Sequence, residues 1–482
     1  MTDTDEVRES SVKPPPKVVP HFTRDERGAR GKAARAEVPR STQADIEFPP
    51  HRDPIALLEE QAVTRVPELV PIRYGRMLVS PFAFYRGGAL IMASDLSRVP
   101  HSGLRVQLCG DAHLSNFGMF GSPERELVFD INDFDETAPG PWEWDVKRLV
   151  ASFAIATREL GFSDKERRTI ALDTARSYRE AMFAFAAMQN LDVWYSHLPV
   201  EVALRTFTRG VDPKRLKRAQ ADVAKVRTKD SMQAFEKLTR VVDGERRIIS
   251  DPPLIVPVDE LLPSELEREA FFDEFRTLIR SYRRTLETDR RHLLEEFRFV
   301  DLARKVVGVG SVGTRAWIGL FLGVDDEDPL FLQMKEAQPS VLEEFVGKSQ
   351  YSNSGQRVVA GQRLMQATSD IFLGWQRVPA GLDGRQRDFY VRQLKDWKGS
   401  FPVEAALPAG ASAYGRMCGW TLARAHARSG DRVAIASYLG KSEVFDQAIA
   451  AFAETYADQN QRDYEALQEA VASGRLTAEL GV

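Results

Sequence analysis

The stretch LCGDAHLSNFGMF, Leu108–Phe120, and the stretch LVFDINDFDETAPGPWEWDVKRL, Leu127–Leu149, lie close together in the chain. Both place carboxylates and other polar side chains between apolar residues, so many of these groups should lie near a core. An ionised carboxylate near a core is costly unless a cation or hydrogen-bond donors meet it. The two stretches therefore predict partners for their carboxylates elsewhere in the chain.

The composition of the whole chain narrows the class of protein. It has 482 residues, 43% of them hydrophobic, enough for a large core shared by two or three domains or lobes. The formal net charge of -4 argues against binding nucleic acid by broad phosphate neutralisation. Two cysteines, Cys109 and Cys418, exclude a disulfide framework and a four-cysteine zinc site, and they fit a reducing compartment.

Two segments bear on localisation. The N-terminus is polar and charged, without the apolar run of a secretory signal. The most apolar long window, Val306–Val324, contains Arg315 and five glycines, so it is too interrupted to span a membrane. We therefore expect a cytoplasmic protein with neither a membrane nor a nucleic-acid partner. The oligomeric state does not follow from the sequence.

The pattern of apolar residues divides the chain into four parts. Residues 1–50 are rich in proline and charge, which predicts a disordered tail. Residues 51–300 are mostly helical, with short strands in the two opening stretches. Residues 301–400 contain KVVGVGSVGTRAWIGLFLGVDDEDPLFLQMKEA, which predicts three strands, followed by a helix and a further strand. Residues 401–482 are helical again. The fold class is α+β, with a mostly helical lobe and a smaller antiparallel-sheet lobe.

Two local predictions fall within the helical lobe. SPFAFYRGGALIMAS, Ser80–Ser94, is predicted to be extended, and its Arg86 is a weak candidate for a phosphate contact. Ser163 and Glu166 have the spacing of a capping box, which places the start of a helix there.

The first chemical motif is D-x-x-x-x-N, formed by Asp111 and Asn116. Phosphoryl-transfer enzymes of the kinase type need such a pair on one loop, where the Asp takes the proton of the attacking hydroxyl and the Asn holds Mg²⁺. Asp133 follows at the end of an apolar strand, where a bound metal would offset the cost of burying its charge. Asp135 is a further candidate ligand. The alternative is a solvated acidic turn, with Asp111 capping a helix.

The second motif is GVGSVG, Gly308–Gly313, between two predicted strands. A strand rather than a helix follows it, so the loop resembles the glycine-rich flap that kinases lay over ATP phosphates. Gly308, Gly310, Ser311 and Gly313 are its candidate nucleotide-binding residues. Lys335 lies in the next apolar strand, where a lysine needs an anion such as the α- and β-phosphates. The alternative is an ordinary tight hairpin.

The quoted motifs resemble those of aminoglycoside and choline kinases, in which His-Gly-Asp-x-His-x-x-Asn precedes Ile-Asp-Phe. The resemblance implies that Asp111 is the catalytic base and His113 the second motif histidine. It also implies that Asn116 and Asp133 are magnesium ligands and that Asp145 is the structural Asp of the following helix. The chain from about residue 50 is also similar to the uncharacterised bacterial family called domain of unknown function 2252.

The order of these parts differs from that of a kinase, in which the glycine loop comes first. Here the helix LARAHARSGD, Leu422–Asp431, resembles the helix that normally leads into the catalytic loop. A circular permutation of a two-lobed protein-kinase-like fold accounts for this order, since chain breaks are tolerated at surfaces. Cys109 replaces the first motif histidine. Glu343 or Glu344 would have to pair with Lys335, because the predicted helix Gln356–Gln366 offers no glutamate.

We therefore expect a kinase-like phosphotransferase that uses ATP and Mg²⁺. Its acceptor would be an unidentified hydroxyl-bearing compound, more plausibly a small molecule than a protein. Transfer of AMP on the same fold is an open alternative. So are a two-metal phosphoesterase, using Asp111, His113, Asp130 and Asp133, and a non-catalytic nucleotide-binding protein.

Overall fold

The computed structural model describes residues 20–208, 211–228, 231–262, 264–306, 308–381, 383–394 and 397–481. Its α-helices are α1 Arg24–Glu37, α2 Pro54–Ala62, α3 Val70–Met77, α4 Pro81–Gly87, α5 Ala89–Leu96, α6 Trp142–Glu159, α7 Asp164–Ala187, α8 Asn190–Tyr195, α9 Val200–Phe207, α10 Pro213–Val226, α11 Ser231–Leu238, α12 Val258–Leu261, α13 Glu265–Arg283, α14 Thr288–Glu295, α15 Glu343–Val346, α16 Ser354–Met365, α17 Pro408–Ser429, α18 Arg432–Leu439 and α19 Val444–Ala472.

The β-strands are β1 Arg105–Leu108, β2 Phe117–Gly121, β3 Leu127–Ile131, β4 Ala138–Pro141, β5 Thr239–Val242, β6 Glu245–Ile248, β7 Ile255–Pro257, β8 Arg298–Lys305, β9 Ala316–Leu322, β10 Pro329–Ala337, β11 Gly374–Val378 and β12 Arg387–Gln393. Five short 3₁₀ turns complete the described elements: η1 Arg40–Ala44, η2 Pro67–Leu69, η3 Leu114–Asn116, η4 Val309–Ser311 and η5 Val403–Ala405. The mixture of helices and antiparallel strands confirms the α+β class.

The largest sheet has six strands in the order β11-β12-β10-β9-β8-β7, and its neighbouring strands are antiparallel. Two apolar clusters pack against it, one with side chains from α13 and the other with side chains from α11. All nine residues of the central strand β10 are consequently buried. The three strands predicted on either side of the glycine loop and the acidic turn are β8, β9 and β10, and the predicted final strand is β12.

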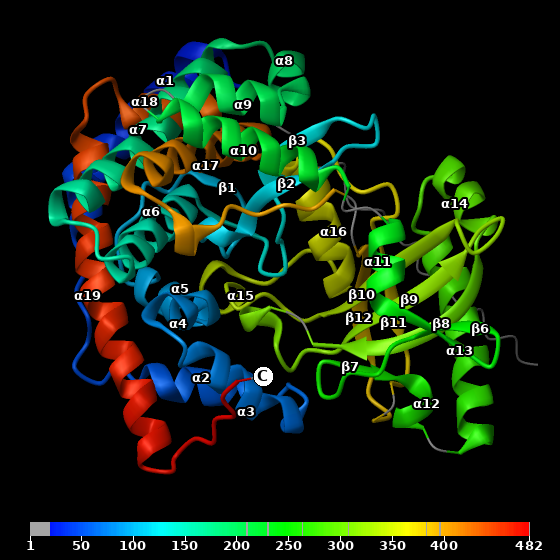
Figure 1. The fold of residues 1–482 in the computed structure, drawn as a ribbon. Helices are drawn as coiled ribbons and strands as arrows, with labels where there is room; N and C mark the ends of the chain where they lie inside the picture. Colours follow the sequence, from blue (N-terminus) through cyan, green and yellow to red (C-terminus); the bar gives the residue numbers. More distant parts are fainter. Residues whose placement is uncertain are drawn as a thin grey trace, which may run out of the picture.

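Helices α12 and α14 also contribute to the core beside α13, whereas most of the other helices form a second part with a separate, larger apolar core. In this part α17 packs along α7, while α6 lies against both α7 and α19. Figure 1 shows these helices on one side of the molecule and the six-stranded sheet on the other. Two small antiparallel ribbons, β1–β4 and β2–β3, join the helical part and carry the two opening stretches of sequence.

Residues 20–50 are not the disordered tail that their composition suggests, and residues 1–19 lie outside the described residues. Thr23 and Glu26 form a capping box that starts α1. Gly31 of α1 lets the helix approach α18 closely, since a Cβ there would lie 2.0 Å from the Ala434 carbonyl oxygen. A charged segment therefore folds because it docks on another helix, which its own composition does not reveal.

Two further expectations need correction. Ser80–Ser94 contains helices α4 and α5 instead of an extended segment, because Ser80 caps a helix whose first residue is Pro81. The boundary between the two parts also lies before residue 300, since α11, α13 and the β5–β6 hairpin pack with the six-stranded sheet.

The predicted capping box of Ser163 and Glu166 is confirmed at the start of α7. Among the described residues, no helix is long and apolar enough to cross a membrane.

Candidate functional site

A polar pocket of about 180 Å³ lies where the β8–β9 loop and strand β10 meet the two opening stretches of sequence. Its lining includes nine of the ten candidate residues: Asp111, His113, Asn116, Asp133, Asp135, Gly308, Gly310, Ser311 and Lys335. The tenth, Gly313, ends the glycine loop without lining the pocket. Side chains from distant parts of the sequence therefore converge on one site.

The loop that carries Asp111 is fixed from below by Asp145, near the start of α6. The Asp145 carboxylate accepts hydrogen bonds from the backbone N–H groups of Cys109, at 2.8 Å, and Gly110, at 3.1 Å. His426 of α17 lies 3.2 Å from the same carboxylate through Nε2, and its Nδ1 lies 2.9 Å from the Tyr178 hydroxyl. His426 is thus a buried structural histidine, which sets the orientation of Asp145.

Gly110 is the residue in this loop that tolerates no side chain. Its φ is +84°, and a Cβ would lie 2.2 Å from the Glu136 carbonyl oxygen. We expect Gly110→Ala to lower the free energy of unfolding by the roughly 1–2 kcal/mol of a left-handed residue, plus about 1–3 kcal/mol for overpacking. Gly161→Ala is the matched control, because Gly161 has φ +72° with no atom within 4 Å of its Cβ position.

Denaturant unfolding of both variants measures this difference. Only the cost of the left-handed backbone should appear in Gly161→Ala. Equal losses in the two variants would mean that the backbone around Gly110 can relax and that the close approach to Glu136 is not a constraint.

Asp111 lies at the pocket wall beside Arg148 of α6, whose Nε donates to Asp111 Oδ1 at 2.6 Å. Burial raises the pKa of Asp111, and Arg148 only partly opposes this. His113 Nδ1 accepts a hydrogen bond from the Ser115 N–H at 3.2 Å, while Nε2 lies 3.7 Å from Asp111 Oδ2. Burial, with the nearby cations Arg86 and Arg148, holds the pKa of His113 well below its ordinary value. The His113 ring is therefore neutral at physiological pH.

Asn116 and Asp133 each present an oxygen that could ligate a metal. The Asn116 amide nitrogen donates to the Asp111 carbonyl oxygen at 2.8 Å, which leaves the amide oxygen without a donor among the described residues. Asp133 Oδ1 accepts from the Asp135 N–H at 3.1 Å, and Oδ2 has no partner among the described residues. Burial and then the Asp135 charge raise the pKa of Asp133. One carboxylate and one amide oxygen beside this polar pocket are oxygen ligands of the kind that Mg²⁺ takes.

Lys335 is 4% exposed and pairs with Asp135, not with a glutamate. Its Nζ lies 2.6 Å from Asp135 Oδ2, although the two residues are 200 positions apart. Tyr390 of β12 donates to the other oxygen of Asp135 at 2.6 Å. Burial raises the pKa of Asp135, but the ion pair with Lys335 outweighs it and the pKa is lowered. Asp135, which the sequence predicts to be a metal ligand, is therefore paired with a lysine in this structure.

The predicted pairing of Lys335 with Glu343 or Glu344 is wrong. Glu343 lies 3.6 Å from the guanidinium of Arg357 on α16. Arg357 also donates to the carbonyl oxygens of Asp135 and Thr137. The helix beside the lysine strand therefore offers an arginine that holds the backbone after Asp133, and the lysine takes its anion from that same segment.

The glycine loop is anchored by residues between α2 and α3. Arg65 donates to the carbonyl oxygens of Val312 and, at 3.0 Å, Gly310. The Val66 N–H donates to the Gly313 carbonyl oxygen at 2.8 Å. Ser311 Oγ donates to Asp135 at 3.1 Å, which ties the loop to the floor of the pocket. Position 313 requires glycine, because φ at Gly313 is +87° and the Arg65 side chain would lie 3.0 Å from an added Cβ.

Several arginines around the pocket were missed by sequence reasoning or given little weight. Arg86 of α4 lines the pocket without a hydrogen bond or ion pair to any described residue, and its Nε is buried. Arg148 lies three residues after Asp145 on the same helix, a spacing that could have indicated a shared face. No spacing in the sequence indicates that Arg65 or Arg392 belongs to the pocket, because they reach it only through loop packing and strand register.

The chain that forms this pocket belongs to a bacterial protein family. The family model described as "Uncharacterized protein conserved in bacteria (DUF2252)" matches residues 65–470, so the chain is a member of this family. The similarity expected from the sequence is thereby confirmed for this family. No curated protein and no solved structure matched the chain. The matched range includes all ten candidate site residues.

Proposed function

We propose that the protein is an ATP- and magnesium-dependent phosphotransferase of the kinase type. One observation carries the proposal: the glycine loop and Lys335 share a pocket with Asp111, Asn116 and Asp133. Nothing local in the sequence would bring these groups together. Their common pocket matches the needs of phosphoryl transfer, a phosphate-binding loop, a lysine, metal ligands and a base.

The order of the elements supports a circularly permuted kinase-like fold. From β8 onward the chain runs through the glycine loop, the lysine strand β10, the helix α16, strands β11 and β12, and helix α17. The Asp111 loop and Asp133 would come next in an unpermuted kinase, and here they precede β8. His426 of α17 touches Asp145, which holds the Asp111 loop. This contact supports the proposed junction between α17 and the loop.

Each residue has a defined task in this proposal. The glycine loop and Lys335 bind the ATP phosphates, which requires Lys335 to exchange Asp135 for phosphate oxygens. Mg²⁺, held by Asn116 and Asp133, would neutralise charge on the phosphates. Asp111 accepts the proton of the attacking hydroxyl, and its raised pKa makes it a better base than an exposed Asp. His113 acts through Asp111 as a positioning residue.

The transferred group is identified by incubating the full chain with ATP labelled at either the α- or the γ-phosphate. The acceptors offered are a library of hydroxyl-bearing metabolites and a bacterial protein extract. Transfer of γ-label alone is the expected result. Transfer of α-label would replace phosphoryl transfer by AMP transfer at the same pocket, and release of phosphate from esters without any nucleotide would replace it by phosphoesterase chemistry.

Lys335→Met should weaken Mg·ATP binding by roughly 10- to 100-fold, the loss typical of a hydrogen bond to a charged group. Isothermal titration calorimetry measures the affinity. Tyr390→Phe is the matched control. It removes the Tyr390 hydroxyl, which donates to Asp135 at 2.6 Å as Lys335 does, but it leaves the Lys335 ammonium in place. An equal loss in both variants would mean that the effect comes from disturbing Asp135, and that Lys335 does not hold the nucleotide.

A further inference from the structure

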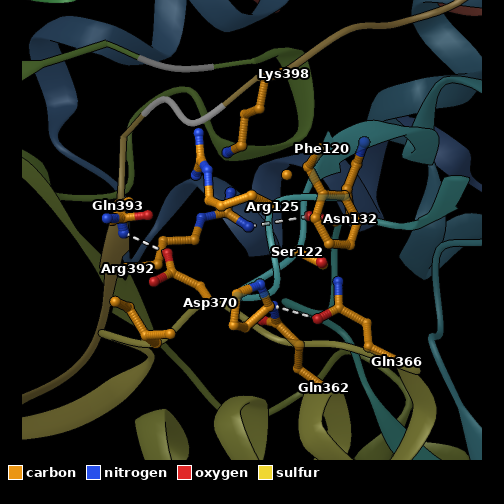
Figure 2. A pocket seen from close by; sticks show the side chains of 13 residues that line it. Phe120, Ser122, Arg125, Asn132, Gln362, Gln366, Asp370, Arg392, Gln393 and Lys398 are labelled. Atoms are coloured by element: carbon orange, nitrogen blue, oxygen red, sulfur yellow. Dashed lines mark hydrogen bonds between the residues drawn. The ribbon is translucent and has the colours of Figure 1, made fainter. Parts of the chain in front are cut away.

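A second cavity, of about 140 Å³, lies against the polar pocket, and Arg392 lines both. We call it the rear cavity. Its wall is formed by the β2–β3 turn, the end of α16, the loop that follows α16 and the residues at the end of β12 (Figure 2). The residues that matter for its chemistry are Asn132, Asp370, Arg392, Gln393 and Lys398.

Two cations in the rear cavity form no ion pair with a described residue. Arg392 donates from Nη1 to the Asn132 carbonyl oxygen at 3.0 Å, as Figure 2 shows, but its buried Nε has no acceptor. Lys398 makes no hydrogen bond or ion pair with any described residue. Burial, and then the Arg392 charge, lower the pKa of the Lys398 ammonium to about 7. A bound anion would therefore stabilise both side chains.

The carboxylate in the wall attracts both cations, but it forms no ion pair with either of them. Asp370 Oδ1 accepts from the Phe372 N–H at 2.8 Å, and Oδ2 accepts from the Gln393 N–H at 2.6 Å. Each oxygen thus accepts from one backbone amide, and burial raises the pKa of this carboxyl group, which the charges of Lys398 and Arg392 only partly oppose. Burial alone would lower the pKa of Arg392, but the nearby charges of Tyr390, Asp133, Asp135 and Asp370 outweigh burial and raise that pKa, so Arg392 stays charged. Since neither Arg392 nor Lys398 has an ion-pair partner among the described residues, both can still contact a ligand.

Two neutral amides complete the site. The side chains of Asn132 and Gln393 line the cavity without a hydrogen bond to another described residue. Such amides suit the hydroxyl groups of a ligand, because each offers both a donor and an acceptor. A guanidinium and an ammonium side by side suit a dianion better than a single carboxylate. The small volume excludes a macromolecular ligand.

We propose that the rear cavity binds the phosphate group of a small phosphorylated metabolite. The ligand's phosphate lies between Arg392 and Lys398, and its hydroxyl groups meet the Asn132 and Gln393 amides. The assignment goes beyond the proposed transfer reaction and does not depend on it. Because Arg392 also lines the polar pocket, the ligand lies beside the nucleotide site without occupying it.

Calorimetric titration of the full chain with glycerol 3-phosphate, in the presence of saturating Mg·ATP, tests the proposal. We expect binding that Lys398→Met weakens by roughly tenfold or more, because a charge-assisted contact is lost. Lys398→Arg keeps the cation and should retain most of the affinity. Lys348→Met, at an exposed lysine outside the cavity, should bind like the unaltered chain, and the melting temperature of each variant reports its folding.

Three results would overturn the assignment. Unchanged affinity in Lys398→Met would place the anion elsewhere. Loss of binding on addition of Mg·ATP, or in Lys335→Met, would show that the phosphate had occupied the polar pocket. Inorganic phosphate that binds as tightly as glycerol 3-phosphate would make the cavity a site for free phosphate rather than for a metabolite.

Discussion

We expect Asp111→Asn to lower the rate of phosphate transfer by about 10²–10⁴-fold, the range for loss of a general base. The substitution keeps the size of the side chain, and its amide oxygen can still accept the hydrogen bond from Arg148 Nε. The basicity of the carboxylate and its negative charge, which pairs with Arg148, are lost. Initial rates with labelled ATP and the acceptor found in the screen measure the effect.

Binding of Mg·ATP should survive the same change, because Asp111 is not assigned to the metal or to the phosphates. The melting temperature with and without Mg·ATP checks this and also reports on folding. An Asp111→Asn protein that transfers phosphate at the full rate would show that the base lies elsewhere, and the catalytic role of this loop would be lost with it.

The second large effect is expected for Asp133→Ala, which should abolish the stabilisation of the protein by Mg·ATP. A ligand at 100 times its Kd stabilises a folded protein by about 2.7 kcal/mol, so the lost shift is readily measured by thermal unfolding. The ligand-free variant should be as stable as the unaltered protein or more so. Burial and then the charge of Asp135 raise the pKa of Asp133 in the unaltered protein, so its charged form is already disfavoured in the folded state.

Asn132→Ala serves as the control for this measurement. Asn132 precedes Asp133, but it lines the rear cavity, and its backbone carbonyl still accepts from Arg392 after the change. It should keep the full Mg·ATP shift, and EDTA should remove the shift from every variant. A shift that persists in Asp133→Ala would exclude Asp133 as the metal ligand.

The sequence predicted much of the site, because the residue types in the motifs show which buried groups need a charged or hydrogen-bonding partner. A lysine in the apolar strand LFLQMKEA needs an anion, and the carboxylates after LVFDI need a cation or donors. The structure pairs these two unsatisfied groups through Lys335 and Asp135. The strands around the glycine loop were also predictable, because their apolar runs are bounded by glycines and an acidic turn.

The predictions failed where packing between distant segments decided the outcome. Residues 20–50 fold because α1 docks on α18, and composition alone cannot show that contact. The predicted partner of Lys335 was Glu343 or Glu344, whereas Asp135 follows β3 and meets the lysine only when the six-stranded sheet packs beside the β2–β3 ribbon. Helix α4 was predicted to be extended, although Ser80 and Pro81 carry the signal of a helix start.

The sequence by itself determined the α+β class, the strands on both sides of the glycine loop and the identity of nine polar-pocket residues. These depend on periodicity and on the cost of burying charge, which are local properties of the chain. Only the tertiary structure decided which charges meet. Arg148 reaches Asp111, Arg65 holds the glycine loop, and Arg392 lines both the polar pocket and the rear cavity. An ion pair such as that of Lys335 with Asp135, 200 positions away, depends on strand register and helix docking, which no local pattern encodes.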